Sequence, residues 1–342
     1  MFVAFGFAIA VLWSIDIVVG APYAIPEEVR SPRFRLVVLA ALLSALLGFI
    51  DDVVDLRARW QLLGQVVVAG IVIAAGIRVD FINNPFDPVQ PLELGILAMP
   101  FTVFWIVGMV NALNFIDGLD GLAAGVAAIA AVVLSLIALS PRVDEPFVAW
   151  IGLTLAGALS GFLFFNFHPA RLFLGTTGVT FVGTILATLA IFGTAKVAAA
   201  LLVLGVPIID TFYVICRRLL TGRPPFAPDR GHFHHRLLDR GLSHRAVVVL
   251  IYGVTAVLGM VALFATGRAQ LLTFVSVLVW LGIIVVVLAQ RSEKAREFAP
   301  DLYPERDQAP TPLPLDLRVG PRPVPPGQGR GSPGAGGADG TS

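Results

Sequence analysis

Residues 111–139 read NALNFIDGLDGLAAGVAAIAAVVLSLIAL, in which a segment bearing amides and aspartates leads directly into an uninterrupted apolar stretch. About 20 apolar residues in a helix cross the ~30 Å hydrocarbon core of a bilayer. Apolar stretches of similar length recur along the chain, at 3–20, 35–50, 60–78, 94–113, 121–139, 147–165, 172–192, 195–215, 246–266 and 270–289. We therefore predict an all-α fold, a polytopic transmembrane helical bundle of about ten spans.

Composition indicates the same fold class. Of the 342 residues, 57% are hydrophobic and 14% are charged, and the mean hydropathy is +0.85, values that exclude a soluble globular domain. Residues 1–290 are predicted to form the membrane domain. Pro, Gly, Arg and Asp then replace apolar residues, so 291–342 is predicted to be a disordered, Pro/Gly-rich cytoplasmic tail.

The polar loops can be assigned to sides by counting passes. Loops 51–59, 114–120, 166–171 and 216–245 are separated from one another by two predicted spans each, so they are expected on one side of the membrane. Loop 216–245 holds seven Arg, and loops rich in Lys and Arg face the cytoplasm. One cytoplasmic end of the bundle is therefore predicted to gather the polar chemistry.

An acidic run, IDDVVDL at 50–56, closes the second predicted span. Asp51, Asp52 and Asp55 are spaced three and four apart, so they can share one helical face. Carboxylates this close repel one another unless a cation joins them. A solvated helix end would also explain the run, but acids beside hydrocarbon usually indicate a functional site.

The segment 111–125 carries a more informative pattern. Amides and acids recur at every third position, at Asn111, Asn114, Asp117 and Asp120. Glycines that permit close approach of a ligand or a neighbouring helix lie between and after them, at Gly118, Gly121 and Gly125. Helix–helix packing through amides and glycines would account for Asn111, but it does not account for two aspartates in apolar surroundings.

A third cluster, PDRGHFHHR at 228–236, contains three histidines in four residues. Zinc is disfavoured because tetrahedral sites draw ligands from two separated pairs, and no Cys or second His pair lies nearby. Arginines that suit phosphate surround the run, at Arg217, Arg218, Arg223, Arg230 and Arg236. Carboxylates for Mg²⁺ and cations for phosphates at one lipid-facing end suit phosphoryl transfer between a nucleotide and a lipid.

In their order and spacing, the segments 51–55, 111–125 and 229–236 resemble the polyprenyl-phosphate N-acetylhexosamine-1-phosphate transferases, the MraY/WecA superfamily. The similarity covers roughly residues 30–250, and NFHPAR at 166–171 and Pro207-x-x-Asp210 add to it. The His-x-His-His form is similar to the WecA branch. The pattern Asn-x-x-Asn-x-x-Asp-Gly-Leu-Asp-Gly-Leu is specific to this family, whereas the acidic run alone is weak.

The resemblance implies an Mg²⁺-dependent enzyme that transfers an N-acetylhexosamine 1-phosphate, with GlcNAc 1-phosphate expected, from a UDP-sugar such as UDP-GlcNAc. The acceptor would be undecaprenyl or decaprenyl phosphate, and UMP would be released. Such a reaction is the first membrane step of a cell-envelope glycan pathway. The expected location is the cell membrane, multi-pass, with the active face cytoplasmic; membrane lipid is an expected partner, a homodimer is left open, and nucleic acid is not expected.

Roles for individual residues follow from the resemblance alone. Asp51 and Asp52 are expected to serve the acceptor phosphate, and Asn114 and Asp117 to hold the metal. The catalytic set is expected to comprise Asp51, Asp52, Asp117 and Asp120. Contacts that orient the nucleotide sugar are expected from Asp120, Asn166, Asp229, His232, His234, His235 and Arg236.

Three features depart from the family pattern. Family members read Gly-Asp-Ser/Thr-Gly where 175–178 read GTTG, so Thr176 offers Mg²⁺ a weaker ligand than a carboxylate. Gln61 stands near the position of a family Lys, with Arg57 or Arg59 as substitutes for that cation, and the chain begins at what resembles the family's second span.

Two functions therefore fit: an active transferase with a rebuilt metal site, and a catalytically impaired membrane scaffold or lipid-phosphate binder. A transporter with a proton relay fits less well, because its acids would lie near mid-membrane rather than at helix ends.

Overall fold

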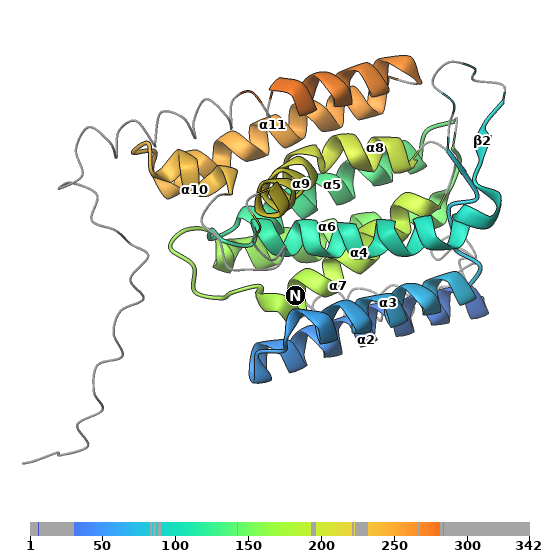
Figure 1. Cartoon of the computed structure of the whole chain (residues 1–342), viewed down its shortest axis with the longest axis horizontal. Coiled ribbons are helices and arrows are strands. Elements are labelled where there is room, and N and C mark those ends of the chain that lie inside the picture. The colour runs from blue at the N-terminus through green and yellow to red at the C-terminus, as the bar shows by residue number, and fades with distance from the viewer. Residues whose placement is uncertain are drawn as a thin grey trace, which may run out of the picture. The chain divides into compact units, whose positions relative to one another are not determined.

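The computed structural model describes residue 6 and residues 31–82, 84, 87, 90–141, 143–192, 196–220, 222, 232–265, 267–280 and 283. The described helices are α2 (Pro32–Val54), α3 (Ala58–Ala74), α4 (Ala98–Ile116), α5 (Leu122–Ala138), α6 (Pro146–Asn166), α7 (Gly175–Ile191), α8 (Lys196–Val203), α9 (Gly205–Leu220), α10 (Phe233–Leu238), α11 (His244–Phe264) and a final helix, Arg268–Trp280. Strands β1 (Phe81–Ile82) and β2 (Leu92–Glu93) pair antiparallel, and a 3₁₀ turn, η2 (Gly95–Leu97), leads into α4. The predicted all-α class is confirmed (Figure 1).

The predicted count of about ten spans is not confirmed. Four helices are long and apolar enough to cross a membrane, and the bent pair α8–α9 would make a fifth. The other apolar helices in the described ranges have 10–17 residues, shorter than the about 20 residues typical of a full crossing. The predicted span 3–20, apart from residue 6, and the predicted tail 291–342 lie outside the described residues.

The stretch 195–215, predicted as one span, is two helices. α8 and α9 meet at Leu204 with a bend of 78°. Pro207 lies in the first turn of α9 and has no N–H to donate to the carbonyl of Val203, so a continuous helix would lack this hydrogen bond. Proline in the first turn of a new helix costs little, and the chain therefore turns here.

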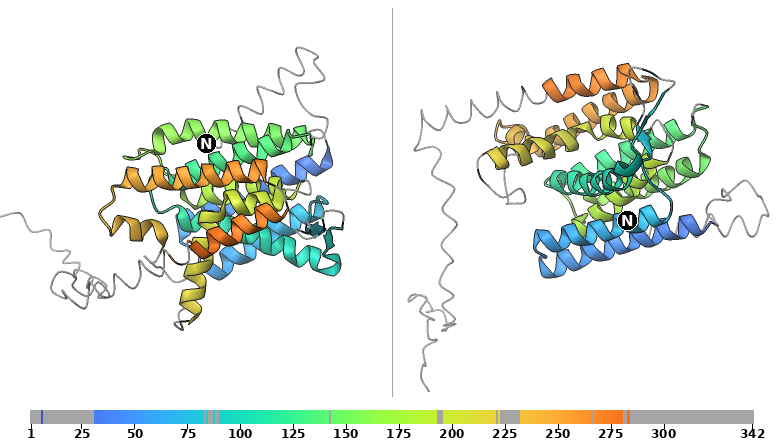
Figure 2. Two further views of the ribbon diagram at one scale, coloured as in Figure 1. Left: turned by 90° about the horizontal axis from the view of Figure 1, so that it is seen from above. Right: turned by 45° about the vertical axis from the view of Figure 1, so that its right-hand side comes forward.

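The core lies around α5 and α7, whose side chains are buried on almost every face. A helix that is apolar all round belongs inside a bundle. α5 packs against α6 and α11, and α7 packs against α2 and α4. The two views in Figure 2 and that in Figure 1 agree that α2 and α3 lie on one flank and α11 on the opposite flank. Large apolar side chains on these outer helices are exposed, as is expected for a multi-pass membrane protein.

Hydroxyl groups join α2 to α7 inside the bundle. Ser44 Oγ donates to the Thr180 carbonyl at 3.0 Å, Thr180 Oγ1 donates to the Ser44 carbonyl at 2.8 Å, and Thr184 Oγ1 donates to Ser44 Oγ at 2.8 Å. One turn further along α2, a Cβ on Gly48 would lie 2.5 Å from the Thr176 carbonyl oxygen. Small and hydroxyl-bearing residues thus bring the two backbones into direct contact.

Candidate active site

The turn between α4 and α5 carries the aspartates of the predicted polar stripe. α4 ends at Ile116 with Asp117 as its C-cap, and α5 begins after Gly121, whose φ is 81°. Glycine adopts this left-handed conformation without strain, which explains its place before α5. The Tyr252 hydroxyl donates a 2.5 Å hydrogen bond to the Gly121 carbonyl, so α11 holds the turn in place.

Asn166 supports the same turn from the end of α6. Its Oδ1 accepts the Gly121 N–H at 3.1 Å, and its Nδ2 donates to the Leu172 carbonyl at 2.8 Å. The residue is 4% exposed. Both ends of the amide are used within the protein, so its position beneath the turn is structural. The substrate contact expected of Asn166 stays a prediction.

Asn111, the first amide of the stripe, joins two helices. Its Nδ2 donates to Gln65 Oε1 of α3 at 2.6 Å and to the Val107 carbonyl at 2.8 Å. Gln65 is itself buried. The amide therefore contributes helix–helix packing, in agreement with the structural explanation that its sequence context allows.

Asp117 differs from its polar neighbours because it has no partner. Among the described residues, neither its carboxylate nor the Asn114 amide has a hydrogen bond, although the Asp117 N–H donates to the Asn114 carbonyl at 3.3 Å. Burial and, second, the negative charge of Asp52 raise the pKa of Asp117 to about 7. An unpaired, partly buried carboxylate in a turn at the end of the bundle is a candidate for binding a cation or a proton.

Asp120, three residues later, has two hydrogen-bond partners at one carboxylate oxygen. Its Oδ2 lies 2.7 Å from His168 Nδ1 and accepts the Ala170 N–H at 3.1 Å. Burial alone would raise the pKa of Asp120, but these hydrogen bonds and the charge of His168 and His244 bring it below its usual value. The His168 and His244 rings stack 4.9 Å apart, and Arg245 donates two hydrogen bonds to the His168 carbonyl. The sequence pattern included His168 within NFHPAR but gave no role for it, and it did not indicate that α11 contributes to this site.

Asp51 is held at one oxygen by Gln61. The Gln61 Nε2 donates to Asp51 Oδ1 at 2.5 Å and to the Leu56 carbonyl at 3.2 Å, while the Leu56 N–H donates to the same Oδ1 at 3.0 Å. Asp51 Oδ2 has no hydrogen bond among the described residues. Gln61 therefore takes the position next to the acid that a Lys was expected to fill, as a neutral donor.

Asp52 lies against the first turn of α7. Its Oδ1 accepts the Thr176 N–H at 2.8 Å, and its Oδ2 accepts the Thr177 N–H at 2.9 Å and the Thr177 hydroxyl at 2.6 Å. Both oxygens are occupied by protein donors. The predicted acceptor-phosphate contact of Asp52 is not tested, but this geometry gives the side chain a structural partner that the sequence did not reveal.

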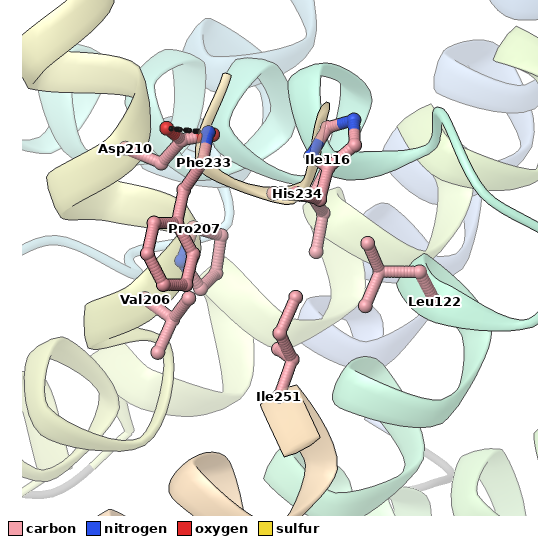
Figure 3. Close-up of a pocket in the computed structure, with 8 residues that line it drawn as sticks. All are labelled: Ile116, Leu122, Val206, Pro207, Asp210, Phe233, His234 and Ile251. Atoms are coloured by element: carbon pink, nitrogen blue, oxygen red, sulfur yellow. Dashed lines mark hydrogen bonds between the residues drawn. The ribbon is translucent and has the colours of Figure 1, made fainter. Parts of the chain in front are cut away.

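His234 and His235 lie in α10, His232 is its N-cap, and Asp210 on α9 anchors this segment. Asp210 Oδ2 lies 2.9 Å from His232 Nδ1, and Asp210 Oδ1 accepts the Phe233 N–H at 2.8 Å, as the dashed line in Figure 3 marks. Asp210 is 2% exposed. The aspartate thus caps α10 from another helix. In the sequence, an aspartate within the mostly apolar first turns of α9 indicates that Asp210 has a buried partner.

His234 reaches the Asp117–Gly118 turn. A Cβ on Gly118 would lie 2.7 Å from His234 Nε2, and this nitrogen is buried without a hydrogen bond in the described part of the chain. Burial and, second, the charge of His235 lower the pKa of His234 to about 3, so the imidazole is neutral at pH 7. It can donate or accept one hydrogen bond from a neutral ring. The nucleotide-sugar contact expected of His234 stays a prediction. The cavity beside it in Figure 3 has about 10 Å³ of free volume, room for at most one water.

Two of the arginines near the histidine run lie over aromatic rings. The Arg236 guanidinium lies 5.5 Å from the Tyr213 ring centre, and Arg218, which is buried, lies 5.8 Å from that of Phe115. His235 packs 4.3 Å from the His234 ring. Asp229, expected to orient the nucleotide sugar, lies outside the described residues.

The four loops that the pass count assigned to one side do meet. Asp52 reaches the start of α7, Asp120 reaches the 167–174 loop, and His234 reaches Gly118. Figure 1 shows α10 at the end of the bundle opposite β2. The predicted grouping of acids, amides and histidines at one end is thus confirmed for the described residues.

The Mg²⁺ that the resemblance implies finds a partial ligand set. No group of three His, Cys, Asp or Glu suited to a metal occurs in the part of the chain that the structure describes. Mg²⁺, however, usually keeps several waters and binds through one or two carboxylates plus substrate phosphates. The unpartnered Asp117 carboxylate and Asn114 amide fit this requirement.

Comparisons with known proteins agree with the helical membrane fold. Residues 34–194 match the model described as glycosyl transferase family 4. A probable undecaprenyl-phosphate N-acetylglucosaminyl 1-phosphate transferase of Bacillus subtilis is 37% identical over 275 residues, covering 78% of this chain and 76% of the relative. A decaprenyl-phosphate N-acetylglucosaminephosphotransferase of Mycolicibacterium smegmatis is 32% identical over 292 residues, with 77% and 72% covered. A phospho-N-acetylmuramoyl-pentapeptide-transferase of Borrelia hermsii is 30% identical over 263 residues, with 67% and 73% covered.

Proposed function

We propose that this chain, which belongs to glycosyl transferase family 4, transfers GlcNAc 1-phosphate from UDP-GlcNAc to undecaprenyl or decaprenyl phosphate. An acceptor phosphate oxygen forms a bond to the sugar-bearing phosphorus, and the bond from that phosphorus to the bridging oxygen breaks, so UMP leaves. The observation that carries the proposal is the unpartnered Asp117 carboxylate where the polar loops meet.

Asp117 and Asn114 are the residues that hold Mg²⁺ in this proposal. When bound, the metal neutralises phosphate charge as it develops in the transition state. Asp117 suits this role because its charge is unfavourable beside Asp52 without a cation. His234 packs against Gly118 and so holds the Asp117–Gly118 turn at a set distance from α10. Its neutral ring offers one hydrogen bond.

Asp51 serves the acceptor phosphate. Gln61 and the Leu56 N–H fix its Oδ1, which leaves Oδ2 to accept a proton from the acceptor or to contact it. Val53 and Val54, in the same last turn of α2, are 68% and 65% exposed, so a lipid tail can approach along this helix end. We place this end at the cytoplasmic face of the cell membrane, because loop 216–245 carries seven Arg.

Release of UMP by the purified full-length protein in lipid nanodiscs tests the proposal. Release that requires UDP-GlcNAc, polyprenyl phosphate and Mg²⁺ together is expected. No release above background with UDP-GlcNAc or related UDP-sugars would contradict it. Thr176 favours one alternative, a binder without turnover, because no carboxylate stands there; binding of polyprenyl phosphate without UMP release is its signature.

A further inference from the structure

The first turn of α7 has no cap from its own chain segment. Leu174 precedes the helix and offers no side-chain hydrogen bond, although the first N–H groups of a helix have no partner within it. Ser, Thr, Asp or Asn normally fills this place. Here Asp52, 124 positions earlier in the sequence than Thr176, supplies the acceptor oxygens from the end of α2.

The backbone around this contact is shaped to admit a carboxylate. Gly175 has a φ of 64°, and a Cβ there would lie 2.9 Å from Asp52 Oδ2. Gly48 allows α2 to touch the Thr176 backbone, and the hydroxyl contacts of Ser44 extend the same interface toward the bundle centre. The carboxylate therefore ends a continuous α2–α7 interface, and its position is set over several turns.

Asp52 also brings a negative charge to the start of α7, where the side chain of Thr176 carries none. Thr176 occupies the first turn of α7, and the N–H groups of Thr176 and Thr177 point at the Asp52 oxygens. Negative charge is stabilised at a helix N-terminus by the helix dipole. After burial, the same charge contributes to the raised pKa of Asp117, the unpartnered acid of the site.

We propose that Asp52 is a positioning residue that caps α7 from α2 and supplies at this helix end the negative charge that position 176 lacks. This inference rests on the proposed function, and it replaces the acceptor-phosphate contact that family resemblance implies for Asp52. Its side chain fixes the start of α7 relative to the Asp117 turn, and Asp51 alone of the pair meets the acceptor.

Amide hydrogen exchange tests the cap without any need for turnover. In Asp52→Asn, exchange at the Thr176 and Thr177 amides is expected to quicken by about tenfold or more, because charge-assisted hydrogen bonds are lost. Asp55→Asn is the matched control, since it removes the same charge from the same run and, within the described residues, the Asp55 side chain makes no hydrogen bond to α7. Equal exchange in wild type and Asp52→Asn would overturn the cap.

Kinetics separate positioning from acceptor contact. Asp52→Asn and Thr177→Val are each expected to lower kcat for UMP release by about tenfold, with KM for polyprenyl phosphate unchanged within about twofold. The double variant is expected to be no less active than Asp52→Asn alone, because Thr177→Val removes one of the three hydrogen bonds that Asp52 accepts. A raised KM in Asp52→Asn, with no effect of Thr177→Val, would show instead that Asp52 touches the acceptor.

A charge transposition tests the second half of the proposal. Asp52→Asn combined with Thr176→Asp keeps one carboxylate at the start of α7, and kcat is expected to return to within about fivefold of wild type. A double variant no better than Asp52→Asn would overturn the charge replacement. If wild type bound both substrates but released no UMP, the proposed function would fall, while the exchange comparison would still decide the cap.

Discussion

Asp52 and Asp117 lie at the ends of α2 and α4, in the same part of the bundle, and interact through their charges. Negative charge is disfavoured at a helix C-terminus, so both side chains begin at a disadvantage. Asp52 overcomes it with three hydrogen bonds from the N-terminus of α7, whereas Asp117 has none within the described residues.

This difference indicates which of the two carboxylates is left unsatisfied by the protein and so is available to a ligand. Asp52 already accepts three hydrogen bonds that join α2 to α7, so its charge is stabilised before any ligand binds. Asp117 gains from any cation that arrives, because its burial and the neighbouring charge are otherwise uncompensated. Two aspartates at similar helix ends therefore have different roles: Asp52 positions the start of α7, and Asp117 is available to bind a cation.

Removal of the Asp117 carboxylate should have the largest effect. Asp117→Asn is expected to lower kcat for UMP release by about 10²–10³-fold, because electrostatic stabilisation of the transferring phosphate is lost. Thermal stability in Mg²⁺-free buffer should not fall, since the uncompensated charge is removed as well. Asp80→Asn, at an exposed pair with Arg78, serves as the control. Activity within tenfold of wild type would remove Asp117 from the mechanism.

The turn that carries Asp117 should be the next most sensitive feature. In Gly125→Ala the added Cβ would lie 1.9 Å from the Tyr252 hydroxyl oxygen, so the hydrogen bond to Gly121 cannot persist. We expect a loss of about 1–3 kcal/mol in stability and reduced activity. Gly161→Ala adds a Cβ that meets nothing within 4 Å and should be neutral. Equal melting temperatures for the two variants would contradict this packing.

Thr176→Asp sharpens the comparison by adding a third carboxylate. Without Mg²⁺, repulsion from Asp52 and Asp117 is expected to lower the melting temperature by a few degrees. With Mg²⁺, the hard anionic oxygen should tighten metal binding by about tenfold and raise turnover. If calorimetry finds lower stability and no additional Mg²⁺ binding, the pocket is not a metal site, and a binding or scaffolding function becomes the better account.

The pH dependence of stability should show the smallest effect. The pKa of Asp117 is raised from 3.8 to about 7 in the folded protein, so its protonated form favours folding. This contribution is complete below pH 3.8 and is lost as the pH rises through 7. In Mg²⁺-free buffer, the melting temperature of wild type should therefore fall relative to Asp117→Asn between pH 5 and pH 8. Parallel curves for the two proteins would mean that Asp117 is not perturbed.

Much of this arrangement could be predicted from sequence. The lengths of the apolar stretches placed the helices, and counting passes brought Asp52, Asp120 and His234 to one end. The partners of these acids could not be predicted. α5 and α7 are apolar on almost every face, so their sequences do not encode which side faces a neighbour. The Asp52–Thr176 contact joins residues 124 positions apart through such a helix.

Local signals explain two further differences. Pro207 indicates a break between α8 and α9, but the stretch 195–215 is apolar on both sides of it and has the length of one span, so the sequence predicts a single helix. The sequence places three histidines beside several arginines, but it does not show that His234 is buried against Gly118, where burial lowers the pKa of its imidazole to about 3. Charge in a sequence gives no measure of burial, and burial decides protonation here.

A calorimetric titration of Mg²⁺, with UDP-GlcNAc present and the lipid acceptor absent, tests the division between the two acids most directly. Asp117→Asn is expected to weaken Mg²⁺ binding by about a hundredfold or more, because it removes a direct ligand. Asp52→Asn is expected to weaken it by no more than about tenfold, because its charge acts only from beside the metal. The reverse ranking, with Asp52→Asn abolishing Mg²⁺ binding and Asp117→Asn retaining it, would contradict the account.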